Sequence, residues 1–177
     1  MGRSQVLRRR IRFLLVAFMT GLVLSGVTAF PLQWELNLLA KWLGATDRAV
    51  PGDYTGLTHW IVRVRNGLRE TYAFYPFIAY GTDWLAFAHL VIAVAFIGPL
   101  RDPVRNVWVL TFGMIACLGV IPLALICGPL RDIPFYWRLL DCSFGIVGSI
   151  PLWLCWRYTQ ELSALEPWGV PQSQLNR

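Results

Sequence analysis

Residues 83–156 decide the fold, and they read DWLAFAHLVIAVAFIGPLRDPVRNVWVLTFGMIACLGVIPLALICGPLRDIPFYWRLLDCSFGIVGSIPLWLCW. The same five residues, Gly-Pro-Leu-Arg-Asp, stand at Gly98–Asp102 and again at Gly128–Asp132, and each copy separates two long apolar runs. Glycine and proline interrupt helices, and aspartate favours a helix start. The stretch therefore predicts three helices, over about 84–100, 107–127 and 134–156, joined by two hinges.

Each residue type in the repeated hinge has an expected task. The glycines take a left-handed cap conformation, the prolines stop the helix, the aspartates start the next helix, and the arginines reach lipid phosphates. The runs that flank the two copies share no further similarity, which favours a turn used twice over an inverted repeat of the transporter kind. The predicted hinge residues are Gly98, Pro99, Arg101, Asp102, Gly128, Pro129, Arg131 and Asp132.

The composition favours a membrane protein. The 177 residues are 56% hydrophobic and only 15% charged, and the mean hydropathy is +0.50. Soluble domains are about 45–50% apolar, so too little polar surface is present to cover a soluble globule of this length. The formal net charge of +6 comes without any nucleic-acid-binding motif, and nucleic acid is therefore not an expected partner.

A fourth span is expected near the N-terminus, over 13–32. These twenty residues are uncharged, which is enough for a helix to cross roughly 30 Å of hydrocarbon. The segment 1–12 before them is a basic tail that should stay in the cytoplasm, and its arginines are Arg3, Arg8, Arg9, Arg10 and Arg12. A competing interpretation is a signal peptide that is cleaved before Phe30, after the small residues at 27–29.

The long segment 33–82 is expected outside the membrane, as part of a single transmembrane domain over 13–157. Within it, 33–43 and 57–71 each show apolar residues at helical spacing, which predicts two amphipathic helices on the outer membrane surface or on the end of the bundle. The fold class is thus all-α, a polytopic membrane four-helix bundle with amphipathic helices in its first external loop.

Charge placement predicts both termini in the cytoplasm, in a plasma membrane or a bacterial inner membrane. The arginines of 1–12 lie directly before the first span, and Arg101 and Arg105 follow the second. A polar C-terminal tail, 158–177, ends the chain on the same side. The lipid bilayer is the first expected partner.

Two ionisable residues inside the apolar runs are the best candidates for a functional site, because burying such groups in lipid is costly. His89 lies five residues past Trp84 and Asp141 four past Trp137, about 6–8 Å below an aromatic belt at 1.5 Å per residue. We expect them to share one layer. Arg138, three residues before Asp141, either pairs with it or reaches outward.

The same layer is expected to include Ser25 and Thr28, near the outer end of the first span. Ala86 and Ala93 share the helical stripe of His89 and would admit a neighbouring helix. In one interpretation the layer fixes the packing of the bundle. In the other it is an acid–base pair or a ligand site, with His89, Asp141 and Arg138 as catalytic candidates.

Cofactor chemistry has weak support in the sequence. A haem held by two histidines would need His59 and His89, and we expect no cofactor. The four cysteines form no C-x-x-C pair, so no metal is expected. The sequence is compatible with a disulfide between Cys127 and Cys142 in an oxidising compartment.

These patterns support three hypotheses for function. The leading one is a non-catalytic accessory subunit, or a binder of a lipophilic small molecule, that works with other membrane proteins. The second is an intramembrane enzyme or proton-coupled carrier that uses His89 and Asp141. The third is a haem-binding redox subunit.

Overall fold

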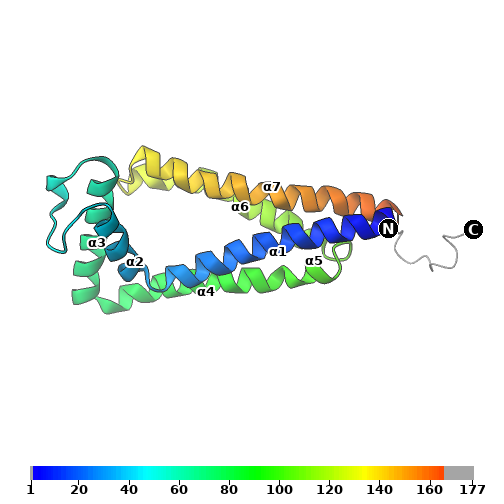
Figure 1. Cartoon of the computed structure of the whole chain (residues 1–177), viewed down its shortest axis with the longest axis horizontal. Coiled ribbons are helices and arrows are strands. Elements are labelled where there is room, and N and C mark those ends of the chain that lie inside the picture. Colours follow the sequence, from blue (N-terminus) through cyan, green and yellow to red (C-terminus); the bar gives the residue numbers. More distant parts are fainter. Residues whose placement is uncertain (1, 166–177) are drawn as a thin grey trace, which may run out of the picture. The chain divides into compact units, whose positions relative to one another are not determined.

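The computed structural model describes residues 2–165, and these contain helices and no strand. The prediction of an all-helical chain is confirmed. Figure 1 shows the order of the helices along the chain. Their bounds are α1 (Arg3–Ala29), α2 (Leu32–Trp42), α3 (Gly56–Phe74), α4 (Ala79–Ala95), α5 (Ile97–Arg101), α6 (Val107–Leu130) and α7 (Phe135–Leu165), with short 3₁₀ turns η1 (Pro51–Asp53) and η2 (Pro76–Ile78).

Four helical segments are long and apolar enough to cross a membrane: Arg3–Ala29, Pro76–Arg101, Val107–Leu130 and Phe135–Leu165. Each overlaps one of the predicted spans, but the ends differ: the first helix ends at Ala29, before the predicted limit at 32, and the fourth begins at Phe135. In α1 the arginine-rich residues before Phe13 are helical because arginine is a good helix former. At the other end, α7 continues past the predicted limit at 156 to Leu165. The rest of the predicted tail, 166–177, lies outside the described residues.

The described chain divides into two compact units. The hairpin unit comprises residues 2–21 and 93–165, and the loop unit comprises Leu22–Ile92. Both α1 and α4 cross a unit boundary, after Gly21 and after Ile92 respectively.

In the hairpin unit, α6 and α7 lie side by side (Figure 1). Their close approach depends on glycine, because a Cβ atom on Gly145 of α7 would collide with the backbone carbonyl of Cys117 on α6. On α6, a Cβ atom at Gly113 would lie 2.8 Å from Leu152 of α7 and 2.6 Å from the ring of Phe96. These contacts fix the register of the hairpin.

The first half of α1 packs in the same unit. The Cys155 thiol of α7 donates a hydrogen bond of 3.7 Å to the backbone carbonyl of Ile11, and Arg3 forms an ion pair with Glu161 at 2.6 Å. Four-residue spacing puts one face of α1 into the core, and this face is Leu7, Ile11 and Leu15, each at most 4% exposed. For Leu7 and Ile11, which precede the apolar run, removal from water stabilises the unit by about 1.5–3 kcal/mol for each side chain.

The repeated pentapeptide does not act as the sequence predicted. The helix continues through both glycine–proline pairs: Gly98 and Pro99 lie inside α5, and Gly128 and Pro129 lie in the last turn of α6. Neither glycine has a positive φ. The prediction of a left-handed glycine followed by a proline stop is therefore wrong, because Pro99 occupies a first helical turn, where no N–H is needed.

What the glycines provide is space. A Cβ atom at Gly98 would lie 2.9 Å from the Oδ1 atom of Asn106, and one at Gly128 would collide with the Cδ atom of Arg138. In each copy a side chain near the start of the next helix therefore lies against the glycine. Asn106 also donates a hydrogen bond of 3.2 Å to the carbonyl of Gly98.

The aspartates also differ from their predicted role as helix starts. Asp102 accepts a 3.1 Å hydrogen bond from the backbone N–H of Arg105 within the turn, while α6 begins after Asn106. Asp132 has a φ of 55° and is the left-handed residue that ends α6. The N–H of Ile133 donates to the carbonyl of Gly128 at 3.0 Å, and that of Asp132 to Pro129 at 3.3 Å, which is a Schellman motif.

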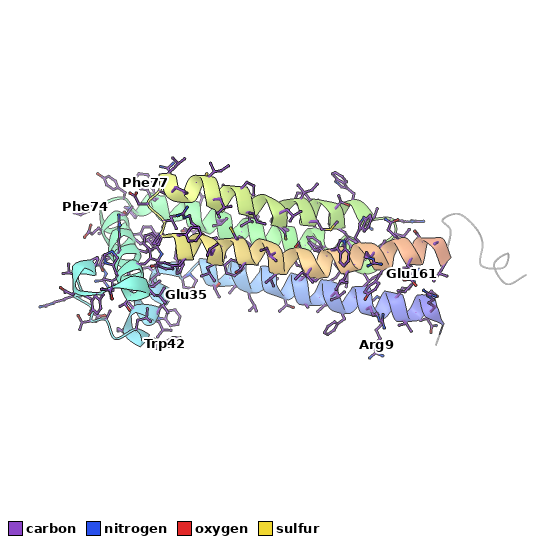
Figure 2. The ribbon with its side chains drawn as sticks, turned by 90° about the horizontal axis from the view of Figure 1, so that it is seen from above. Arg9, Glu35, Trp42, Phe74, Phe77 and Glu161 are labelled. Atoms are coloured by element: carbon purple, nitrogen blue, oxygen red, sulfur yellow. The ribbon has the colours of Figure 1, made fainter. Side chains whose placement is uncertain are left out.

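In the loop unit, α2 packs on α3 (Figure 1). Both predicted helices are present. The apolar pattern predicted for the first one consists of Trp34, Leu38 and Trp42, whose two tryptophans form the aromatic stripe of α2. This stripe does not pack: Leu36 and Ala40 are buried, whereas Trp34 and Trp42 are 63% and 76% exposed. Figure 2 labels Trp42 at the edge of α2. The apolar stripe predicted for the membrane surface is therefore left uncovered by α3.

Candidate functional site

The first candidate site is the contact of α1 with His89 of α4 in the loop unit. Gly26 of α1 faces α4 so closely that a Cβ atom there would lie 2.9 Å from the Ala86 carbonyl, 3.1 Å from the Cβ of His89 and 3.1 Å from Leu90. Ala86 is fully buried, as expected of a small residue that admits a neighbouring helix. The prediction that a helix approaches along the His89 stripe is confirmed at Ala86, and its partner Gly26 was not predicted.

The hydrogen bonding of His89 fixes where its proton lies. Its Nδ1 atom is 2.8 Å from the carbonyl oxygen of Leu85, and since a carbonyl only accepts, Nδ1 carries the proton. In the neutral form of the ring, the lone pair then lies on Nε2. That atom can accept a proton or a hydrogen bond from a ligand, the behaviour needed of a general base.

Ser25 and Thr28 lie one position before and two positions after Gly26 on α1. The hydroxyl of Thr28 donates a 3.3 Å hydrogen bond to the carbonyl of Ser25, which satisfies it within its own helix. The two residues thus belong to the helix end that packs near His89. No hydrogen bond to the histidine ring is formed by either among the described residues.

Asp141 belongs to the hairpin unit, on α7, whereas His89 belongs to the loop unit. A shared layer of the two residues stays a prediction. Arg138 lies in the hairpin unit with Asp141, and an outward reach of its side chain stays a prediction. Its guanidinium lies over the ring of Phe135, 5.1 Å from the ring centre, its side chain rests on Gly128, and it forms no ion pair with Asp141 in the described part of the chain.

The structure places His59, Cys127 and Cys142, the residues named above for a haem or a disulfide. The Nδ1 atom of His59 is 2.8 Å from the carbonyl of Pro51, which ties the ring to the loop before α3. Cys127 is exposed, Cys142 is buried, and the two are not bridged. Within residues 2–165, no group of three or more metal-ligating side chains comes together.

The residue that the sequence did not single out is Arg65 of α3, which is fully buried. Its guanidinium donates to the carbonyl of Thr46 and to the side chain of Asn66, both at 3.1 Å. Asn66 in turn donates to Ala49 at 2.9 Å, and Arg69 to Asp47 at 3.1 Å. Three neighbouring side chains of α3 thus hold three carbonyls of one loop, an arrangement we call the arginine clasp.

Burial lowers the pKa of the Arg65 guanidinium, and the positive charge of Arg69 lowers it further. The group still carries its charge at neutral pH, because a guanidinium group is effectively always protonated in a protein. Arg65 lies four residues after Ile61, on the buried face of α3, and this spacing was the available signal. A charged residue in a polar loop is usually solvated, which is why the pattern did not reveal it.

Neither a family model, nor a curated protein, nor a solved structure matches this chain.

Proposed function

We propose that the chain is a multi-pass membrane protein and a non-catalytic accessory subunit, which binds a helix of another membrane protein through α6. One observation carries the proposal: α6 has an apolar face that no other described part of the hairpin unit covers. The segment has the highest mean hydropathy of the four candidate spans, 2.5, and the smallest buried share, 11%.

The two faces of α6 are separated cleanly by helical spacing. Leu110, Gly113 and Cys117 lie on the face that packs on α7. On the opposite face, at 100° per residue, stand large exposed side chains with Gly119 among them, where a Cβ atom would meet nothing within 4 Å. The exposed members are Trp108 (69%), Phe112 (43%), Ile115 (58%) and Ile126 (63%).

This face has the composition of a helix-packing surface. In a membrane, association between helices depends on close van der Waals packing, and small residues among large ones allow it. The hydroxyl groups of the spans support a role without catalysis, because they donate to carbonyls of their own helices: Thr20 to Val16, Thr111 to Val107, Ser143 to Leu140 and Ser149 to Ile146.

The external helices and the location belong to the same proposal. The uncovered aromatic stripe of α2 lies on the outer membrane surface, where tryptophan is favoured. The membrane is a plasma membrane or a bacterial inner membrane with both termini in the cytoplasm, as the arginines before the first apolar run indicate.

The proposal is tested by photo-crosslinking in native membranes. A crosslinking amino acid at Ile115 of α6 should give a discrete protein adduct, and Gly119→Ile should abolish it because the added side chain blocks close approach. The matched control is the same amino acid at Phe144 of α7, which is 66% exposed and should give lipid adducts only. Lipid adducts alone at Ile115 contradict the proposal, and an adduct with a small lipophilic molecule favours the ligand-binding form of the hypothesis.

A second function, proton transfer by His89 and Asp141 in an intramembrane enzyme or carrier, has one supporting observation. The Nε2 atom of His89 is left as a proton acceptor by the hydrogen bond at Nδ1. His89→Gln and Asp141→Asn remove this chemistry while keeping the size of each side chain. If folded variants fully restore the phenotype of cells that lack the protein, this second function is excluded.

A further inference from the structure

A groove of about 300 Å³ lies beside the first turns of α1, and its described lining is Val6, Arg9, Arg10 and Phe13. These four residues follow one another at i, i+3, i+4 and i+7, the spacing that places residues on one face of a helix. Arg9 and Arg10 therefore share one face of α1 with Val6 and Phe13. The volume of the groove is at the lower end of the range of small-molecule sites.

The charge around the groove is positive and not neutralised locally. Five arginines and no acidic residue occur within 3–12. Glu161, on the helix that packs against this part of α1, is already engaged by Arg3 at 2.6 Å. Within residues 2–165, neither Arg9 nor Arg10 forms an ion pair with a carboxylate. A negatively charged ligand would therefore find two guanidinium groups that lack an anionic partner.

The two arginines are held differently. Arg10 lies over the ring of Tyr158, 5.8 Å from its centre, a cation–π contact that restricts the side chain. Figure 2 shows Arg9 projecting away from α1. One guanidinium is thus positioned in advance and the other is free to close on a ligand. Guanidinium pairs of this kind bind phosphate oxygens in a bidentate manner.

The apolar side of the groove distinguishes a lipid from a free phosphate. Phe13 begins the apolar run of the first candidate span and is 74% exposed, and Val16 in the next turn is 50% exposed. Arg9 and Phe13 are four residues apart, about 6 Å along the helix. A phosphate held by the arginines therefore places an attached acyl chain directly on an exposed apolar surface.

We propose that this groove binds the headgroup of an anionic phospholipid. The phosphate accepts hydrogen bonds from Arg9 and Arg10, and an acyl chain runs along Phe13 and Val16. The site goes beyond the proposed function, because it uses a different helix and a different ligand from the α6 face. It also assigns to two of the five arginines a task more specific than setting the orientation of the chain.

The test compares two double variants of the full chain that lose the same charge. Arg9→Gln with Arg10→Gln removes the groove cations, whereas Arg8→Gln with Arg12→Gln removes two arginines that do not line it. Each protein is titrated in neutral detergent with dioleoyl phosphatidylglycerol, dioleoyl phosphatidylcholine or inorganic phosphate, and bound lipid is counted by native mass spectrometry. Circular dichroism checks that the variants are folded.

The wild type should bind phosphatidylglycerol about tenfold or more tightly than phosphatidylcholine, since each basic residue near an anionic lipid contributes a factor of about five. The groove variant should lose this preference and the control variant should keep most of it. Phe13→Ala should weaken the binding of phosphatidylglycerol and should not strengthen the binding of phosphatidylcholine. Equal losses in both double variants, or inorganic phosphate binding as tightly as the lipid, overturn the proposal.

Discussion

Gly26 of α1 and His89 of α4 lie so close together that only a residue without a side chain fits at position 26. A Cβ atom on Gly26 would lie 3.1 Å from the Cβ of His89. The same atom would lie 2.9 Å from the carbonyl of Ala86, which cannot move without bending the helix. The position of His89 in the loop unit therefore depends on a glycine in a different helix.

The first prediction concerns this contact. Gly26→Leu should separate α1 from α4 and lower the free energy of unfolding by about 1–3 kcal/mol, the usual cost of overpacking. The midpoint of thermal unfolding in detergent measures it. Gly21→Leu is the matched control, because a Cβ atom at Gly21 meets nothing within 4 Å, and leucine is the better helix former. Equal unfolding midpoints for the two variants would show that the α1–α4 contact contributes little.

The second prediction concerns the end of α6. Asp132 has a φ of 55°, a conformation that costs a residue with a side chain more than it costs glycine. Asp132→Gly should raise the free energy of unfolding by about 0.5–1 kcal/mol, because the relieved left-handed strain exceeds the entropy that glycine adds to the unfolded chain. Asp132→Val should lower it. The comparison variant is Arg131→Gly, whose φ is −118° and which should gain nothing. Thermal unfolding again gives the measurement, and a loss of stability in Asp132→Gly would contradict the Schellman assignment.

The third prediction concerns the arginine clasp. Arg65→Ala leaves the carbonyl of Thr46 and the side chain of Asn66 without their donor, at a cost of about 1–3 kcal/mol. Amide hydrogen exchange should then rise across 44–50, the loop that the clasp holds. Arg63→Ala, on the exposed side of the same helix, should change stability by no more than about 0.5 kcal/mol. If 44–50 exchanges at the same rate in both variants, Arg65 does not hold the loop.

What the sequence revealed depended on the range of the interaction involved. The four apolar runs were visible because hydropathy is a property of each segment by itself. The ends of the helices were harder to predict from the sequence. Asp132 and Gly128 both occur in helix-ending patterns, and only the backbone hydrogen bonds show that Asp132 takes the left-handed position. The rule that assigns this conformation to glycine was sound, but a nearby aspartate satisfied the same requirement.

The candidate site was harder to predict because its contacts join distant parts of the chain. His89 was found since an ionisable group in an apolar run is conspicuous, but Gly26 lies sixty-three positions earlier and carries no signal alone. Arg65 was concealed differently. Its position on the helix predicted a buried side chain, whereas its charge predicted an exposed one. The hydrogen bond to the loop carbonyl of Thr46 explains how the charged group can be buried.

The fourth prediction is the topology. Reporter fusions after residues 50 and 131 should be active outside the membrane, and fusions after 104 and 170 should report a cytoplasmic position, because the arginines of 3–12 hold the first helix with its N-terminus inside. Alkaline phosphatase and green fluorescent protein give complementary readouts at each site. An outside position for 104 would reverse α4 relative to α1 and would remove the basis for one shared layer of His89 and Asp141.

The fifth prediction is that α1 is retained. Cleavage before Phe30 would remove Leu7, Ile11 and Leu15, which are buried in the hairpin unit, and would expose the apolar face of α7 around Cys155. It would also leave Glu161 without Arg3, its partner at 2.6 Å. Intact-mass analysis of the protein from native membranes should therefore find residues 2–29 present. A mature N-terminus at Phe30 would mean that α7 buries this face against something other than α1, and the lipid site at Arg9 and Arg10 would then be lost with the cleaved segment.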